Sequence, residues 1–142
     1  MILRLEKEHL ADVAQIESLC FAEPWSEKSL NILTESGAVG FVVISKGRAV
    51  AYGGMICVLD EGQITNIAVH PDYRRRGFGK DVTRALIDYG KAVGLSQIYL
   101  EVRRSNDAAQ LLYKKLDFDI IGERKGFYRN PIEDAILMKL TL

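Results

Sequence analysis

A run of basic residues and glycines in the middle of the chain has the composition of an anion-binding loop. The run holds four cations and two glycines: Arg74, Arg75, Arg76, Lys80, Gly77 and Gly79. Because glycine lacks a side chain, a ligand can approach the backbone closely at these positions. Free N–H groups at the start of a helix attract an anion, helped by the helix dipole. The loop therefore predicts a phosphate or pyrophosphate ligand.

The spacing of the glycines excludes two common phosphate motifs. A Walker loop requires Gly-x-x-x-x-Gly-Lys followed by Ser or Thr, and the sequence contains none. A dinucleotide fingerprint requires a third glycine at the position where Val82 stands. A solvated basic turn without a ligand stays open as the alternative interpretation, since runs of charge usually face water.

Hydrophobic periodicity predicts the elements that must position this loop. Alternating or apolar runs predict strands over residues 2–5, 41–44, 49–59, 63–69, 98–102, 118–127 and 133–141. Apolar residues at three- and four-residue spacing predict helices over residues 8–21 and 79–93 and a third opened by Ser105 or Asn106, while Ser26 opens a shorter one. The order β-α-α-β-β-β-α-β-α-β-β predicts one α+β (mixed α/β) domain over residues 1–142, with a mostly antiparallel sheet flanked by helices.

The composition is that of an ordinary globular domain and disfavours two classes of ligand. The chain has 142 residues, of which 48% are hydrophobic and 27% are charged. Nineteen Lys and Arg residues balance nineteen Asp and Glu residues, so we expect no nucleic-acid partner. Cys20 and Cys57 have no metal-ligand spacing and there are only two histidines, so we expect no metal and two cysteines that pack as small hydrophobes.

The start of the chain and its longest apolar stretch predict a cytoplasmic protein. The first seven residues carry charges where a signal peptide needs an apolar segment. The longest apolar stretch, residues 49–59, is about half a membrane span. We therefore expect a cytoplasmic chain without a membrane partner, and a monomer or weak dimer.

The pattern Arg74-x-x-Gly77-x-Gly79 resembles the acyl-CoA pyrophosphate loop of the GNAT superfamily of N-acetyltransferases. The resemblance covers the whole chain, because the predicted element order is also that of the superfamily. Three further segments are similar to the ribosomal-protein-alanine N-acetyltransferases within it: Leu100-Glu101-Val102-Arg103-Arg104-Ser105-Asn106 with Ala109, Leu112, Tyr113 and Phe118, then Phe21-x-x-Pro24-Trp25-Ser26, and Tyr128-x-x-Pro131-x-Glu133-Asp134-Ala135.

This resemblance implies an acyltransferase that uses acetyl-CoA as co-substrate and acetylates a protein N-terminus. The implied acceptor is the N-terminal alanine of the eighteenth small-subunit ribosomal protein. The acetyl-CoA-binding residues would be Ile67, Ala68, Val69, Arg74, Arg75, Arg76, Gly77, Phe78, Gly79, Lys80, Asn106 and Tyr113. The residues that wall the peptide site would be Phe21, Pro24, Trp25, Tyr128, Glu133 and Asp134.

The resemblance also implies two catalytic roles. Glu101 would accept the proton of the attacking amine, directly or through water, and Tyr113 would donate a proton or hydrogen bond to the leaving sulfur. An α-amine has a pKa of about 7.7–8.0, so a modest base suffices. The alternative for Glu101 is an ordinary surface glutamate, and the alternative for Tyr113 is a tyrosine that only packs in the core. Likewise, the alternative interpretation of Asn106 is a helix cap, and that of Trp25 is a lid over the hydrophobic core.

Glu133 and Asp134 have their own alternative as the turn at a strand start. Two positions depart from the family pattern: Asp117 replaces a glycine, and Phe127 replaces a tyrosine. Asp tolerates the left-handed conformation that such a turn needs.

Two other functions stay open: acetylation of lysine side chains or small-molecule amines, and a CoA-binding module without turnover. A lysine amine, with a pKa of about 10.4, would demand more of the base.

Overall fold

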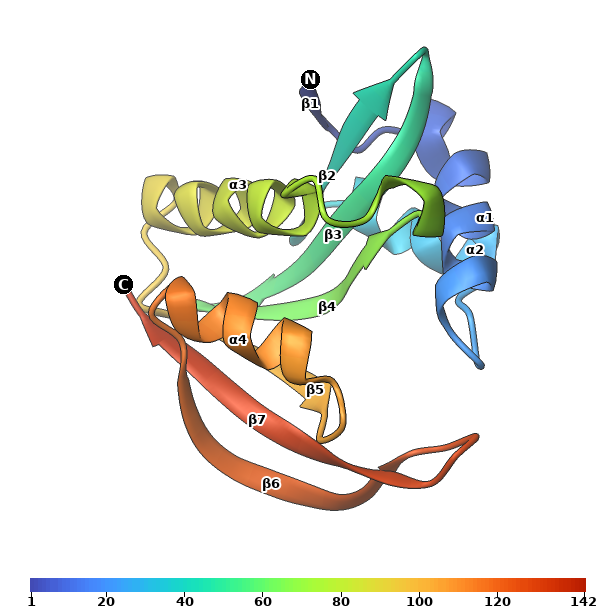
Figure 1. The fold of residues 1–142 in the computed structure, drawn as a ribbon. Helices are drawn as coiled ribbons and strands as arrows, with labels where there is room; N and C mark the ends of the chain where they lie inside the picture. The colour runs from blue at the N-terminus through green and yellow to red at the C-terminus, as the bar shows by residue number, and fades with distance from the viewer.

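Seven strands form one sheet in the computed structural model, which describes residues 1–142 (Figure 1). The strands are β1 Ile2–Arg4, β2 Ala38–Ser45, β3 Arg48–Val58, β4 Glu61–Val69, β5 Gln97–Arg103, β6 Asp119–Tyr128 and β7 Glu133–Thr141. The α-helices are α1 Leu10–Cys20, α2 Glu27–Leu30, α3 Phe78–Ala92 and α4 Asp107–Lys115, with 3₁₀ turns at Lys7–His9, Asn31–Thr34 and Pro71–Tyr73. The strand order is β1-β2-β3-β4-β5-β7-β6, and only β4 and β5 pair in parallel. The predicted element order and the mostly antiparallel sheet are confirmed.

Apolar side chains hold helices against both faces of the sheet. Helices α3 and α4 pack on one face, and α1 and α2 on the other (Figure 1). The larger cluster, on the α3 and α4 side, includes Leu86, Ile98, Tyr113, Phe118 and Met138. The cluster on the α1 and α2 side includes Val13, Ile16, Leu30, Leu33 and Tyr52. Burial of these side chains provides the main driving force that fixes the helices relative to the strands.

Side-chain caps set the starts of two helices, α2 and α4. The Ser26 hydroxyl accepts a hydrogen bond from the Ser29 amide at 3.1 Å, and the Asn106 side chain accepts one from the Ala109 amide at 3.1 Å. Asn106, and not Ser105, therefore caps α4. Asp117 takes the left-handed conformation, with φ of 73°, that its position requires. Helix α1 begins at Leu10, later than expected, because the preceding residues form a tight 3₁₀ turn in which the Glu6 amide donates to His9 Nδ1.

Strands β4 and β5 separate after a short pairing. They pair only at Glu61 with Gln97, Gly62 with Ile98 and Gln63 with Tyr99, and then diverge (Figure 1). Residues 64–69 of β4 therefore pair with β3 alone, and residues 100–103 of β5 with β7 alone. We call the space between these two strand ends the opening.

The backbone of β4 contributes hydrogen-bonding groups to the opening. The amide of His70 donates to the Val50 carbonyl at 2.8 Å. Hydrogen-bonding direction alternates along an antiparallel strand, so Ile67 and Val69 turn their N–H and C=O groups away from β3 and toward the opening. The separation of two central strands thus exposes main-chain donors and acceptors inside the sheet.

Strand β6 forms one edge of the sheet and is irregular. Its register with β7 shifts between Ile120 and Gly122, and again between Arg124 and Tyr128. The strand bends around the base of α4 and carries the β6–β7 hairpin toward the side of the molecule where α1 and α2 lie (Figure 1). None of the helices has the length and apolar character needed to cross a lipid bilayer.

Candidate active site

The loop between β4 and α3 presents free amide groups beside the opening. Gly77 caps α3 in the left-handed conformation, with φ of 82°, and the first amide that donates within the helix is that of Asp81, to the Gly77 carbonyl at 3.0 Å. The amides of residues 78–80 therefore have no acceptor in the helix. A Cβ on Gly79 would meet only Val69 and Leu112, at 3.6 and 3.7 Å. The start of α3 thus lies next to the end of β4 and to α4.

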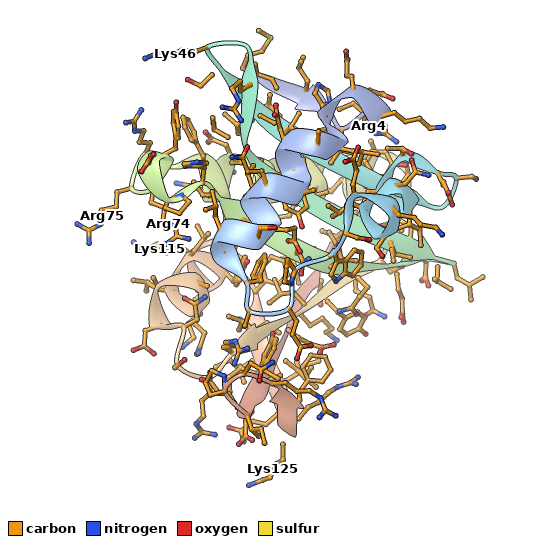
Figure 2. The ribbon with its side chains drawn as sticks, turned by 90° about the vertical axis from the view of Figure 1, so that its right-hand side faces the viewer. Arg4, Lys46, Arg74, Arg75, Lys115 and Lys125 are labelled. Carbon is orange, nitrogen blue, oxygen red and sulfur yellow. The ribbon has the colours of Figure 1, made fainter.

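The predicted cations of this loop point in different directions. Arg74 folds back on the end of β4, where its guanidinium donates to the Val69 carbonyl at 3.3 Å and to the Cys20 sulfur at 3.4 Å. Arg76 lies over the Tyr73 ring, 4.9 Å from its centroid. Arg75 extends from the surface, on the side of the molecule that also carries Arg74 and Lys115 (Figure 2). The exposed loop thus keeps Arg75, and also Lys80, free of internal ion pairs.

The two cysteines do more than fill space. Cys20 Sγ donates to the Val69 carbonyl at 3.3 Å and accepts from Arg74, so it helps to fasten the loop to α1. Cys57 is half-buried, and burial raises the pKa of its thiol. The prediction that both thiols only pack as small hydrophobes is therefore incomplete, because tertiary packing placed polar partners around Cys20.

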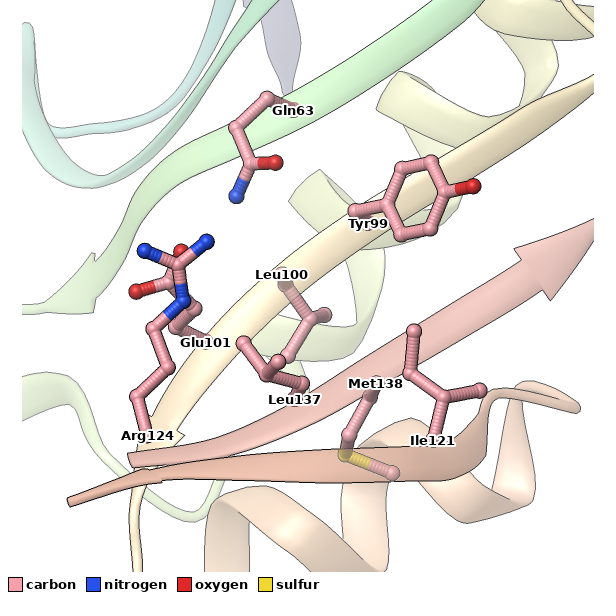
Figure 3. Close-up of a pocket in the computed structure, with 8 residues that line it drawn as sticks. All are labelled: Gln63, Tyr99, Leu100, Glu101, Ile121, Arg124, Leu137 and Met138. Carbon is pink, nitrogen blue, oxygen red and sulfur yellow. The ribbon is translucent and has the colours of Figure 1, made fainter. Parts of the chain in front are cut away.

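Glu101 lines a pocket formed by β4, β5, β6 and β7. The pocket has a volume of about 190 Å³ and is lined by Gln63, Tyr99, Leu100, Glu101, Ile121, Arg124, Leu137 and Met138 (Figure 3). Glu101 Oε2 is buried and has no hydrogen-bond partner in the protein. A buried polar atom without a partner is rare in folded proteins. The alternative of an ordinary exposed glutamate does not describe this side chain, which can accept a proton from a group in the pocket.

Tyr128 lies within electrostatic reach of Glu101, and Tyr113 lies within reach of Tyr128. Burial, and then the negative charge of Glu101, raise the pKa of Tyr128 to about 12, while Arg103 opposes the shift. Burial raises the pKa of Tyr113, with a smaller contribution from Tyr128. The Tyr113 ring packs edge-on against Phe118, and no hydrogen bond within the protein engages its hydroxyl. Both phenols stay protonated at neutral pH and can act as hydrogen-bond donors.

The β6–β7 hairpin that carries Tyr128 is fixed to the end of β5. The Arg103 guanidinium lies 4.5 Å from the Tyr128 ring centroid, pairs with Glu133 at 3.3 Å and donates to the Arg129 carbonyl at 2.8 Å. Glu133 also accepts from the Ser105 amide. The Asp134 side chain accepts from the Gly126 amide at 2.9 Å. Both acidic residues therefore make internal contacts, and their role toward a peptide stays a prediction.

Replacing Glu133 by Gln should lower the melting temperature more at pH 7 than at about pH 3. Hydrogen bonds from Ser105, and then Arg103, lower the pKa of Glu133 below 4.5. A carboxylate whose pKa falls on folding adds stability above its unfolded pKa, and this stability is lost as pH falls through the folded pKa. Thermal melts of parent and variant at both pH values measure the difference. Equal differences at the two pH values would contradict the assignment.

The loop between α1 and α2 reaches the β6–β7 hairpin. Asn130 Nδ2, in the hairpin turn, donates to Glu23 Oε1 at 3.0 Å, and Figure 1 shows the two segments on the same side of the molecule. Trp25 is half-buried and packs against the apolar cluster under α1, while its amide donates to Glu17 Oε1 at 2.9 Å. The Phe21 side chain is exposed to solvent. The two segments predicted to wall a peptide site are thus brought together.

Several residues at the site were not predicted from the sequence. Gln63 and Arg124 line the pocket with Glu101, and Glu17 and Asn66 form a buried polar cluster behind Trp25. Only Glu17 has a signal in the sequence, because it is a charged residue on the apolar face of its helix. The other three lie on strands whose pairing had to be known first.

A model of the Acetyltransferase (GNAT) family matches residues 10–118. The chain belongs to the GNAT family. It is 37% identical to the ribosomal protein bS18-alanine N-acetyltransferase of Escherichia coli strain K12, over 99% of this chain and 97% of the relative. The enzyme of the same name from Salmonella typhimurium is 38% identical, over 90% of this chain and 88% of the relative.

Solved structures agree with this GNAT assignment. The crystal structure of the ribosomal-protein-S18-alanine N-acetyltransferase from Escherichia coli matches with a TM-score of 0.92 and 37% identity, over 99% of this chain and 92% of that one. Arabidopsis thaliana NAA60 in complex with acetyl-CoA has the same fold, with a TM-score of 0.89 at 18% identity. The predicted fold class and the predicted acetyltransferase class are therefore confirmed for this GNAT protein.

Proposed function

We propose that this GNAT protein transfers an acetyl group from acetyl-CoA to the α-amine of a protein N-terminus, and that its acceptor is the N-terminal alanine of ribosomal protein bS18. The observation that carries the proposal is the buried, unpartnered oxygen of Glu101, in a pocket beside the opening between β4 and β5. The names of the 37–38% identical relatives support the choice of acceptor.

The residues around the opening fit acetyl-CoA, which supplies the acetyl group and a thiolate leaving group. The free amides of residues 78–80 and the cations Arg75 and Lys80 would hold the pyrophosphate. The outward-facing N–H groups of Ile67 and Val69 and the carbonyl of Ile67 would bind the amide-containing arm of the molecule along β4, while the Val69 carbonyl is held by Arg74 and Cys20. Asn106 caps α4 with its oxygen, which leaves its Nδ2 group free to donate as well.

The chain's own groups can perform each step of the transfer. At pH 7 a minority of α-amines, with a pKa of about 7.7–8.0, is unprotonated and nucleophilic. Attack forms the N–C bond, and Glu101 accepts the amine proton directly or through water. Backbone amides on β4 stabilise the oxyanion. The C–S bond then breaks, and the Tyr113 hydroxyl donates to the departing thiolate.

Replacing Tyr113 by Phe should lower kcat and leave the melting temperature unchanged. The Tyr113 hydroxyl makes no hydrogen bond in the free protein, so its removal costs no internal bond. A hydrogen bond to a charged leaving group contributes about 1.5–3 kcal/mol, which corresponds to roughly 10- to 100-fold in rate. Steady-state kinetics and thermal melts on the same preparations measure both quantities. Parental kcat with a lowered melting temperature would assign Tyr113 to packing alone.

A peptide panel tests the proposed acceptor directly. The protein and acetyl-CoA are incubated with a peptide bearing a free N-terminal alanine, a peptide with a blocked N-terminus and a lysine, and a small polyamine. Mass spectrometry should find acetylation of the first at its α-amine only. Acetylation of the blocked peptide or of the polyamine would favour the lysine or small-molecule alternative. Binding of CoA without any transfer would favour the module without turnover.

The proposal extends to the setting of the reaction. A ribosomal-protein acceptor places the enzyme in the cytoplasm, and the balanced charge of the chain favours recognition of a peptide without nucleic acid. We infer one domain over residues 1–142 and a monomer or weak dimer, which light scattering at several protein concentrations would measure.

A further inference from the structure

A fully buried carboxylate lies behind the predicted peptide site, and the proposed chemistry does not use it. Glu17, on α1, has no exposed surface. Its Oε2 accepts hydrogen bonds from the Tyr52 hydroxyl at 2.5 Å and from Asn66 Nδ2 at 3.2 Å, and its Oε1 accepts one from the Trp25 amide at 2.9 Å. Burying a carboxylate is costly, and an apolar side chain of similar size often stabilises a core as well or better. Stability alone therefore does not account for this residue.

The three donors to Glu17 come from three different segments: the loop after α1, β3 and β4. Trp25 lies in the loop between α1 and α2, which contacts the β6–β7 hairpin through Glu23. Asn66 lies on β4 at the opening, directly before Ile67. Tyr52 lies on β3 and pairs with Ala68 of β4. One carboxylate thus fixes the Trp25 loop relative to the strand whose backbone faces the opening.

We propose that Glu17 is a positioning residue for the acceptor. It does not touch the reacting atoms. It holds the Trp25 loop at a fixed place relative to β4, so that an amine presented along this loop meets the Glu101 pocket. The inference rests on the proposed function, because it assumes that the Trp25 loop contacts the acceptor. Glu17 makes no hydrogen bond to the loop that begins α3, where the proposal puts the pyrophosphate of acetyl-CoA.

Replacing Glu17 by Gln tests the inference with little change in side-chain shape. A glutamine presents one accepting oxygen and one NH₂ group, so it cannot accept from all three donors. We expect kcat/KM for an N-terminal alanine peptide to fall about tenfold or more, since a small misplacement of a reactant is costly. The KM for acetyl-CoA should stay within about twofold, because the loop that begins α3 makes no contact with Glu17.

Asp12 provides a matched control on the same helix. Its carboxylate accepts from the Ala49 amide at 3.0 Å and so also ties α1 to β3, but away from the Trp25 loop. If Glu17 served stability alone, Glu17→Gln and Asp12→Asn would both lower the melting temperature and leave the kinetics of the folded protein unchanged. The inference requires the kinetic loss in Glu17→Gln only.

Trp25 offers a readout that does not depend on turnover, because it is the only tryptophan of the chain. Release of its loop should shift the emission to longer wavelength and increase acrylamide quenching in Glu17→Gln, but not in Asp12→Asn. If Glu17→Gln does not fold, Tyr52→Phe removes one of the same three bonds while keeping the ring, and should change both readouts in the same direction.

The outcomes separate the two proposals. Parental fluorescence and parental kcat/KM in a folded Glu17→Gln variant would overturn the role of Glu17. A parent protein that binds acetyl-CoA but acetylates no N-terminal peptide would refute the proposed function, and the fluorescence comparison would still decide whether Glu17 holds the loop.

Discussion

Replacing Gly79 by alanine should weaken CoA binding by roughly 10²-fold or more while the protein stays folded. The new Cβ would lie where the proposal puts the pyrophosphate, against the free amides at the start of α3. Hydrogen bonds to a charged group contribute about 1.5–3 kcal/mol each, so losing two is enough for this effect. Isothermal titration calorimetry with CoA measures the loss.

The structure makes this variant informative, because nothing in the protein itself opposes the new methyl group. The Cβ would meet Val69 at 3.6 Å and Leu112 at 3.7 Å, both ordinary contact distances. Alanine also favours a helix over glycine by up to about 1 kcal/mol, so the melting temperature should be equal or higher. Gly122→Ala is the control, since its Cβ would likewise meet a side chain only at an ordinary contact distance, Leu137 at 3.7 Å, but lies on β6. CoA binding of parental strength in Gly79→Ala would remove the loop from the site.

Replacing Glu101 by Gln should lower kcat by roughly 10²-fold at pH 7, the lower part of the range for a positioned base. The amide keeps the shape of the side chain in its pocket but cannot accept the amine proton. CoA affinity should change little, because the loop that begins α3 is separate from the pocket. Activity should recover in part above pH 8, where most α-amines are already deprotonated.

Kinetics across pH 6 to about 9 test the role of Glu101, with initial rates measured at saturating acetyl-CoA. Glu123→Gln is a suitable control, because Glu123 lies on β6 and pairs with Arg104 at 2.7 Å on the exposed surface. Full activity of Glu101→Gln at pH 7 would exclude it as the base. Equal losses in both variants would indicate a general effect of removing charge near the hairpin.

Helix ends and turns that depend on local residues were predictable from the sequence. Ser26 caps α2, Gly94 follows the end of α3 in the left-handed conformation, and Asp117 adopts the turn conformation expected of it. Each depends on one residue and its immediate neighbours. The resemblance to the family then supplied the proposed roles of Glu101 and Tyr113, which no periodicity could have suggested.

What could not be predicted depends on contacts between distant segments. The early separation of β4 from β5 involves segments that are far apart along the chain, because β4 ends at Val69 and β5 begins at Gln97. Arg74 was predicted to meet a phosphate, and the structure shows its guanidinium bonded to Val69 and Cys20. Glu17 lies with Val13 and Ile16 on the buried face of α1. A charged residue on an apolar helix face is a usable signal, but its partners become known only with the fold.

The irregular edge of the sheet bears on how the protein avoids aggregation. An exposed, regular strand offers a ladder of unpaired amides and carbonyls to another copy of the chain. Strand β6 is ten residues long, but its register shifts twice; Glu123 and Arg124 stand between the two shifts, and Lys125 lies within the second. The bends and charges make this edge a poor template for intermolecular strand pairing. The hairpin that carries Tyr128 can therefore stay open to solvent, and to an incoming peptide, without joining molecules edge to edge.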